Sequence, residues 1–182
     1  MLTADAFGIL PPIARLSRDQ ALYYFLSGFT AKLAGTEIGV TEPQPTFSTC
    51  FGAPFLPQPP AVYAGMLGRK LDEHGSTVWL VNTGWTGGQF GEGSRMPIAA
   101  TRPMLHAALS GALAGVASRT APVFGLHVPV AVPGVHAQLL DPPAPWRAPP
   151  APHTTAPAPP PMFRENFKRF DDSSLAEAGP GS

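Results

Sequence analysis

A glycine-rich stretch from Asn82 to Arg95 is the segment best suited to chemistry. It reads Asn-Thr-Gly-Trp-Thr-Gly-Gly-Gln-Phe-Gly-Glu-Gly-Ser-Arg. Glycine leaves backbone N–H groups uncrowded by a Cβ, and the Arg95 guanidinium can face a phosphate or stack on a base. The stretch lacks the Gly-Lys-Ser/Thr ending of a P-loop and the Gly-x-Gly-x-x-Gly of a dinucleotide-binding turn. From its residues alone, it is either a nucleotide-facing loop or a flexible surface loop.

The other reactive side chains have no spacing typical of a catalytic or metal centre. Cys50 is the only cysteine, which excludes an intrachain disulfide, and it stands among aromatic residues, where cysteine more often packs as a small hydrophobe than reacts. The five histidines lack metal-ligand spacing. Asp171 and Asp172 fall in a polar tail, and the spacing of Glu37 and Glu42 does not favour acid–base chemistry over surface placement. We therefore predict no metal site and no catalytic residue.

Two elements must hold the glycine-rich stretch in place. Residues 78–81, Val-Trp-Leu-Val, form a short apolar run typical of a buried strand, and they lead directly into the glycines. After the stretch, Thr101 is predicted to be the N-cap of a helix from Arg102 to about Leu113. The sequence thus predicts a strand, a glycine-rich loop and a helix in succession.

The rest of the chain also alternates between helix and strand patterns, which is typical of an α/β protein. Ser17-Arg-Asp-Gln20 has the form of a capping box and predicts a helix over residues 18–34. A second helix is predicted from Pro59-Pro60 to His74. Further elements are predicted at residues 2–12 (the end of a strand and a turn), 40–55 (an irregular loop held by phenylalanines), 123–132 (a strand) and 162–170 (an amphipathic helix).

Length and composition limit the class of protein. The chain has 182 residues, a length typical of a single domain. It has 12 basic and 12 acidic side chains. This balance excludes a basic nucleic-acid-binding protein. No run approaches the roughly 18 apolar residues that cross a bilayer, and the first residues lack the features of a signal peptide. We expect a soluble, cytoplasmic protein with no nucleic-acid or membrane partner.

Proline is concentrated in one tract. Ten of the twenty residues from Pro142 to Pro161 are proline and five are alanine. Proline lacks an N–H and clashes with the preceding turn, so the tract is predicted to be an extended connector rather than a helix or inner strand. The chain therefore divides into residues 1–141, an aberrant Pro/Ala-rich connector at 142–161, and a terminal helix and tail at 162–182.

Several long motifs in order carry a resemblance to a known family. They are Leu2-Thr-Ala-Asp-Ala-Phe-Gly-Ile-Leu-Pro-Pro12, Tyr24-Phe-Leu-Ser-Gly-Phe-Thr-Ala-Lys-Leu-Ala-Gly-Thr-Glu37, Phe47-Ser-Thr-Cys-Phe-Gly-Ala-Pro-Phe55 and Leu80-Val-Asn-Thr-Gly-Trp-Thr-Gly-Gly88. Together they strongly resemble the C-terminal third of ATP-dependent phosphoenolpyruvate carboxykinase. The resemblance runs from Leu2 to about Asp141 and resumes from Met162 to Phe170.

The resemblance implies an α/β fold, the C-terminal part of a mononucleotide-binding domain with an incomplete mixed sheet. It also implies a carboxy-lyase of gluconeogenesis that converts oxaloacetate and ATP to phosphoenolpyruvate, carbon dioxide and ADP with magnesium and manganese. The family's P-loop, metal ligands and substrate-binding residues would lie N-terminal to Met1. Because phosphoryl transfer depends on such groups, we expect this chain to supply only the adenine side of the ATP site and to be inactive alone.

Three residues match positions that line the family's adenine site. Arg95 and Met96 stand where the family has an Arg-Ile pair, and Thr101 matches a threonine a short step onward. The resemblance implies that Arg95 places its guanidinium against the base. It implies that Met96 packs apolar atoms and a backbone group there, and that Thr101 supplies a hydroxyl. Methionine in place of isoleucine is a mild departure.

The proline tract is the strong departure from the family. The family has a charged, alanine-rich helical stretch there, whereas this chain keeps the flanks and Trp146 and replaces the rest with proline. Equal length with foreign composition suggests the hypothesis of a short out-of-frame segment. Two alternatives to an enzyme fragment stay open: a non-catalytic truncated remnant, and a subunit that complements a separately encoded N-terminal piece.

Overall fold

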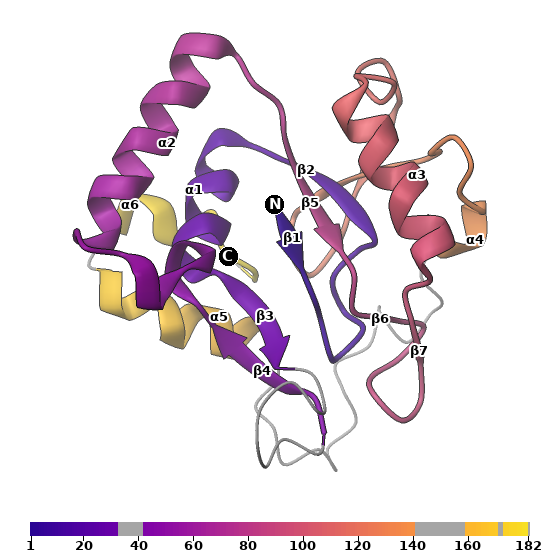
Figure 1. The fold of residues 1–182 in the computed structure, drawn as a ribbon, viewed down its shortest axis with the longest axis horizontal. Helices are drawn as coiled ribbons and strands as arrows, with labels where there is room; N and C mark the ends of the chain where they lie inside the picture. Colours follow the sequence, from indigo (N-terminus) through magenta and orange to yellow (C-terminus); the bar gives the residue numbers. More distant parts are fainter. Residues whose placement is uncertain (33–41, 141–158, 171–172, 182) are drawn as a thin grey trace.

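A five-stranded mixed sheet lies at the centre of the chain (Figure 1). The computed structural model describes residues 1–32, 42–140, 159–170 and 173–181. The strand order is β1-β5-β2-β9-β8, with β1 parallel to β5 and the other neighbours antiparallel. The prediction of an α/β fold with a mixed sheet is therefore confirmed.

The strands are short, and two small antiparallel pairs lie outside the main sheet. The main sheet contains β1 (Leu2–Thr3), β2 (Ile13–Leu16), β5 (Val78–Asn82), β8 (Ser118–Thr120) and β9 (His127–Pro129). The small pairs are β3 (Phe29–Lys32) with β4 (Gln44–Phe47), and β6 (Trp85–Thr86) with β7 (Ser94–Arg95). The α-helices are α1 (Arg18–Ser27), α2 (Pro60–His74), α3 (Ile98–Leu109), α4 (Ala137–Leu140), α5 (Pro159–Phe167) and α6 (Ser173–Ala176).

Alternation along β2 and β5 creates two hydrophobic cores. Ile13 pairs with Val81 and Ala14 with Leu80, and successive side chains of a strand point to opposite faces. Ile13 and Val81 belong to one core, which α3 completes, and we call it the α3-side core. Ala14 and Leu80 belong to the other, the α1-side core, together with residues of α1, α2 and α5. Figure 1 shows these helix groups on the two sides of the sheet.

Helix α1 has the predicted start but an earlier end. The Ser17 hydroxyl accepts from the backbone N–H of Gln20 while the Gln20 side chain accepts from the N–H of Ser17, so the capping box is confirmed. The predicted helix over 18–34 is wrong beyond Ser27, because Gly28 adopts a left-handed conformation with φ 58° and ends it. The chain then continues as β3.

The C-terminal helix begins inside the proline-rich tract. Pro159, Pro160 and Pro161 lie in the first turn of α5, which corrects the prediction that the whole of 142–161 is a non-helical connector. A first turn has no intrahelical partner for its N–H groups, so proline costs little there. Residues 142–158 of the tract, Glu37, and the Asp171-Asp172 pair lie outside the described residues.

Two further predictions need correction. Residues 40–55 contain β4 and two 3-10 turns rather than only an irregular loop, although residues 40 and 41 are outside the described part. The predicted strand over 123–132 is confined to His127–Pro129, and its partner Ser118–Thr120 went unpredicted. By contrast, α2 runs from Pro60 to His74, as predicted.

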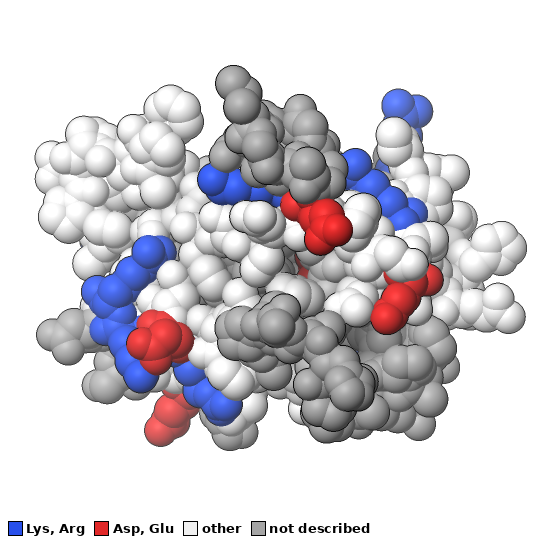
Figure 2. All heavy atoms as spheres, turned by 90° about the horizontal axis from the view of Figure 1, so that it is seen from below, with Lys and Arg blue, Asp and Glu red and all other residues white. Residues whose placement is uncertain are grey.

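On the face that Figure 2 shows, Lys and Arg side chains lie among Asp and Glu side chains and uncharged residues. Across the described ranges, no helix combines the length and apolar character needed to cross a bilayer.

Candidate functional site

The glycine-rich stretch forms a hairpin that follows β5. In this hairpin β6 pairs with β7, so that Trp85 lies opposite Arg95 and Thr86 opposite Ser94. Trp85 is buried, and Phe90 packs edge-on against its ring with the centroids 5.5 Å apart. The stretch is therefore an ordered hairpin with an aromatic anchor, and β7 leads through Pro97 into α3 (Figure 1).

Arg95 is the exposed cation of this hairpin. Its guanidinium carbon lies 5.9 Å from the centroid of the Trp85 ring, and its Nε lies 3.5 Å from the carbonyl oxygen of Thr83. It forms no salt bridge with any residue in the described part of the chain. A planar cation held beside an indole and open to solvent can stack on a base or bind an anion.

Met96 and Thr101 connect the hairpin to α3. The Met96 side chain is buried in the α3-side core with Met104, and its N–H donates to the carbonyl oxygen of Gly84 at 2.7 Å. Thr101 lies inside α3, where its hydroxyl donates to the Pro97 carbonyl at 3.3 Å. The predicted N-cap at Thr101 is wrong, because alanines 99 and 100 extend the helix back to Ile98 and Pro97 stands at the cap position. The three predicted adenine-site residues thus flank the start of α3, and their contact with a base stays a prediction.

Two buried polar residues that sequence reasoning missed support this hairpin. The Asp5 carboxylate accepts backbone N–H groups from Phe7 at 2.9 Å, Ile9 at 2.5 Å and Leu10 at 2.7 Å. The Asn82 carboxamide oxygen accepts from the N–H groups of Asp5 and Gly84. Its nitrogen donates to the carbonyls of Leu10 and Trp85. An isolated Asp or Asn in an apolar segment near a glycine often accepts hydrogen bonds from the backbone N–H groups of the turn that follows it. This signal could have identified Asp5 and Asn82.

Close backbone contacts join residues 5–10 to the hairpin. The N–H of Trp85 donates to the Asp5 carbonyl at 2.7 Å, and the N–H of Phe90 donates to the Ala6 carbonyl at 2.9 Å. A Cβ on Gly84 would lie 2.2 Å from the Asp5 nitrogen, and a Cβ on Gly8 would lie 2.1 Å from the Gly88 oxygen. Glycine is required at both positions because two backbone segments touch there.

The burial of Asp5 predicts that the stability of the fold depends on pH. Burial raises the pKa of Asp5 from 3.8 to about 6, although the backbone hydrogen bonds to Leu10, Phe7, Ile9 and Gly8 oppose the rise. A raised pKa means that the folded state holds this proton longer than the unfolded state does. We therefore expect the free energy of unfolding to fall by about 3 kcal/mol as the pH rises from about 4 to about 6.

Chemical denaturation at pH 4, 5, 6 and 7 measures this dependence, and Asp5→Asn should remove the slope between pH 4 and 6. Asp19→Asn, which changes an exposed aspartate on α1, is the control and should retain it. Equal slopes in the wild type and in Asp5→Asn would refute the assignment to Asp5.

The remaining candidate residues are not brought together with Arg95. Cys50 is half-buried, and burial raises the pKa of its thiol, which favours the protonated form over the nucleophilic thiolate. In the described ranges, no three His, Cys, Asp or Glu side chains group together in a way that could hold a metal ion. A cavity of about 600 Å³ lies between α1, α2 and the C-terminal residues, and a second of about 410 Å³ lies beside the end of α2. Neither is lined by Arg95, Met96 or Thr101.

Comparison with known proteins identifies the family of this chain. A family profile described as phosphoenolpyruvate carboxykinase matches residues 1–138. A protein of Lysinibacillus sphaericus, strain C3-41, named phosphoenolpyruvate carboxykinase (ATP), is 58% identical over 175 residues, which cover 96% of this chain and 33% of that protein. The chain belongs to the ATP-type phosphoenolpyruvate carboxykinase family.

Two other relatives have the same name, and this chain covers a similar share of their length. A Cereibacter sphaeroides protein, strain ATCC 17029, is 61% identical over 170 residues, covering 93% of this chain and 32% of its own length. A Rhizobium meliloti protein, strain 1021, is 56% identical over 185 residues, covering 100% of this chain and 34% of its own length. Both are named phosphoenolpyruvate carboxykinase (ATP). The chain spans about a third of the length of the curated relatives it matches.

Proposed function

We propose that this chain serves the ATP-dependent decarboxylation and phosphorylation of oxaloacetate to phosphoenolpyruvate, carbon dioxide and ADP. The observation that carries this proposal is the 56–61% identity to relatives named phosphoenolpyruvate carboxykinase (ATP). The reaction belongs to gluconeogenesis and takes place in the cytoplasm. ATP and oxaloacetate are the proposed small-molecule partners.

Within this reaction, the chain contributes the adenine side of the ATP site. Arg95 is exposed at the end of β7 beside the Trp85 ring, where its guanidinium plane can lie against a purine. Thr101 offers a hydroxyl one helical turn into α3. Because the side chain of Met96 is packed in the α3-side core, Met96 contributes to the site by holding the backbone between Arg95 and Pro97.

The phosphate and metal side of the site is proposed to come from protein outside these 182 residues. No Gly-Lys-Ser/Thr motif occurs in the sequence, and the described residues contain no group of ligands that fits magnesium or manganese. Such groups position and neutralise the transferred phosphoryl group. The chain alone is therefore proposed to recognise adenine without turnover, and the separate N-terminal piece stays the alternative source of these groups.

Titration of the ¹⁵N-labelled chain with adenosine, ATP and tripolyphosphate tests the adenine assignment. Adenosine and ATP should shift the Trp85 indole N–H and Arg95 Nε–H signals, and tripolyphosphate should not. Arg95→Ala is expected to weaken adenosine binding about tenfold or more, because a lost interaction with a charged group costs about 1.5–3 kcal/mol.

Arg69→Ala is the matched control, since Arg69 is exposed on α2, on the other side of the sheet. It removes the same charge and should leave the affinity unchanged. If tripolyphosphate produced the shifts and adenosine did not, the site would be a phosphate site and the adenine assignment would be wrong.

A further inference from the structure

The hydrogen bonds around Asp5 and Asn82 form one buried unit that spans two distant parts of the sequence. Both side chains are fully buried, with 0% exposure. Asp5 follows β1, Asn82 ends β5, and the two strands are parallel neighbours in which Thr3 pairs with Asn82. We call the two side chains and the backbone groups they bind the Asp5–Asn82 unit.

The Asp5 carboxylate shapes the segment that faces the hairpin. By accepting three N–H groups from residues 7, 9 and 10, it folds residues 5–10 around itself. This turn brings the Ala6 carbonyl to the Phe90 N–H and places Gly8 against the backbone of Gly88. An acceptor-only group suits this position, because every atom that meets the carboxylate in these bonds is a donor.

The Asn82 carboxamide fixes the other end of the hairpin. Its oxygen accepts a hydrogen bond from the N–H of Gly84 at 2.8 Å, and its nitrogen donates to the carbonyl oxygen of Trp85 at 3.3 Å. The carbonyl of Gly84 in turn accepts the Met96 N–H at 2.7 Å. Both strands of the hairpin, and hence the backbone of Arg95, are therefore tied to this one side chain.

We propose that Asp5 and Asn82 are positioning residues, which orient the glycine-rich hairpin so that Arg95 meets the adenine ring. Neither side chain touches the nucleotide, and each acts through the backbone of residues 84–96. The inference rests on the proposed function, since it concerns the same adenine site. The proposed role is to orient the hairpin, and it differs from a contribution to the overall stability of the fold.

Amide hydrogen exchange and adenosine affinity of the 182-residue chain test this role. Asp5→Asn replaces one acceptor oxygen by a donor NH₂ that faces backbone N–H groups. We expect exchange at the amides of Trp85, Phe90 and Met96 to rise at least tenfold more than at the Gly28 amide that ends α1. Adenosine affinity should fall about tenfold.

Thr3→Val provides the control of similar chemistry. Thr3 is buried and donates to the Phe29 carbonyl in β3 at 2.6 Å, so this variant also loses a buried side-chain hydrogen bond close to Asp5. It should lower stability while leaving adenosine affinity and the relative exchange of the hairpin amides unchanged. If Thr3→Val and Asp5→Asn gave the same exchange pattern and the same affinity, the role would be structural only and the proposal overturned.

Asn82→Asp covers the case in which Asp5→Asn does not fold. It keeps the acceptor oxygen for Asp5 and Gly84 but removes the donors to Leu10 and Trp85. The same selective loosening of the hairpin is expected, and its absence overturns the proposal. If the wild-type chain does not bind adenosine, the proposed adenine site is refuted. The exchange data then still decide whether the Asp5–Asn82 unit orients the hairpin.

Discussion

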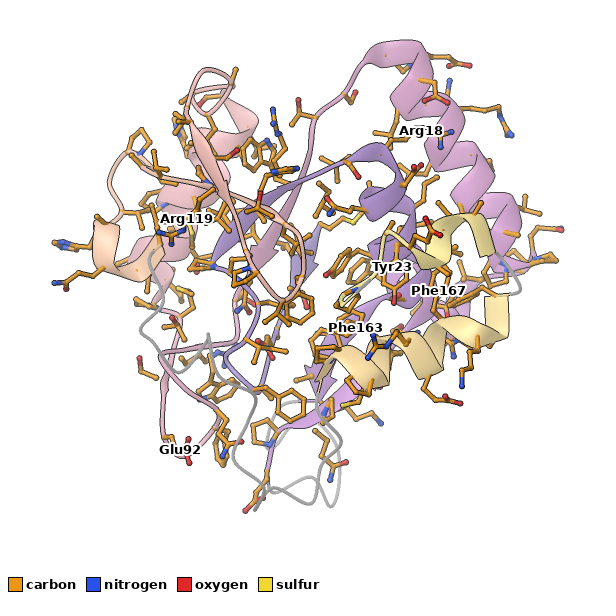
Figure 3. All side chains as sticks on the ribbon, turned by 180° about the vertical axis from the view of Figure 1, so that it is seen from behind. Arg18, Tyr23, Glu92, Arg119, Phe163 and Phe167 are labelled. Atoms are coloured by element: carbon orange, nitrogen blue, oxygen red, sulfur yellow. The ribbon has the colours of Figure 1, made fainter. Side chains whose placement is uncertain are left out.

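Replacing Phe163 by alanine is expected to destabilise the chain by about 3–5 kcal/mol. Phe163 in α5 has 0% exposure, and its ring lies 4.7–6.4 Å from five other aromatic rings. These rings belong to Tyr23, Tyr24, Phe29, Phe47 and Phe124. Figure 3 shows Phe163 and Phe167 close to Tyr23 of α1. The substitution leaves a cavity at the point where four separate segments meet.

Urea denaturation followed by circular dichroism measures the loss for Phe163→Ala. Phe55→Ala is the matched control, because Phe55 is 85% exposed, and it should change stability by less than about 0.5 kcal/mol. Since natural domains are stable by only about 5–15 kcal/mol, Phe163→Leu offers a milder second variant, with an expected loss below about 1.5 kcal/mol. A Phe163→Ala chain within about 1 kcal/mol of the wild type would show that α5 does not complete the α1-side core.

Gly84→Ala is expected to have an effect of similar size, through overpacking instead of a cavity. The new Cβ would lie 2.2 Å from the nitrogen and 2.3 Å from the oxygen of Asp5. Both are backbone atoms, so relief requires the segment around Asp5 to move away from the hairpin. That movement breaks the Asp5 N–H bond to Asn82 and the Trp85 N–H bond to the Asp5 carbonyl. Overpacking and lost buried hydrogen bonds together should cost more than about 3 kcal/mol.

Gly115→Ala makes this test specific for the close contact. Neither Gly84 nor Gly115 has a left-handed backbone, and a Cβ on Gly115 meets nothing within 4 Å. Gly115→Ala should therefore be neutral or slightly stabilising, because alanine restricts the unfolded chain. Thermal unfolding of both variants is the measurement. Equal midpoints for the two would mean that residues 5–10 and the hairpin separate easily, contrary to the structure.

The elements with clear end signals could be predicted from the sequence. Helix α2 lies between Pro59-Pro60 and His74-Gly75, where proline and glycine set both ends, and Gly75 caps it with a left-handed φ of 58°. The start of α1 could be predicted because Ser17 and Gln20 form a capping box, which is also a clear end signal. Its end was missed because the apolar pattern continues past Gly28 into β3, and the periodicity of a buried segment does not separate helix from strand.

The candidate site could be predicted only in part. The resemblance pointed to Arg95, Met96 and Thr101, and the glycines marked the hairpin between β5 and α3. Asp5 and Asn82 could not be connected from the sequence, because they are 77 positions apart and the parallel pairing of β1 with β5 depends on the whole sheet. The packing of Met96 into the α3-side core likewise depends on where α3 lies, and spacing along the chain does not give that.

The division into two cores has a consequence for synthesis on the ribosome. Among the described residues, the α3-side core draws its members from Ile13 to Leu140, so these have been made before the proline tract is translated. The α1-side core lacks Phe163, Phe167 and Leu175 until residues 163–175 have been made. At about 5–20 residues per second, synthesis of the roughly 140 residues between Tyr24 and Phe163 takes about 7–30 seconds, during which the aromatic side chains of α1 lack these partners. During that interval Tyr23 and Tyr24 lack the rings of Phe163 and Phe167 that pack against them in the folded chain, so the α1-side core is completed later than the α3-side core.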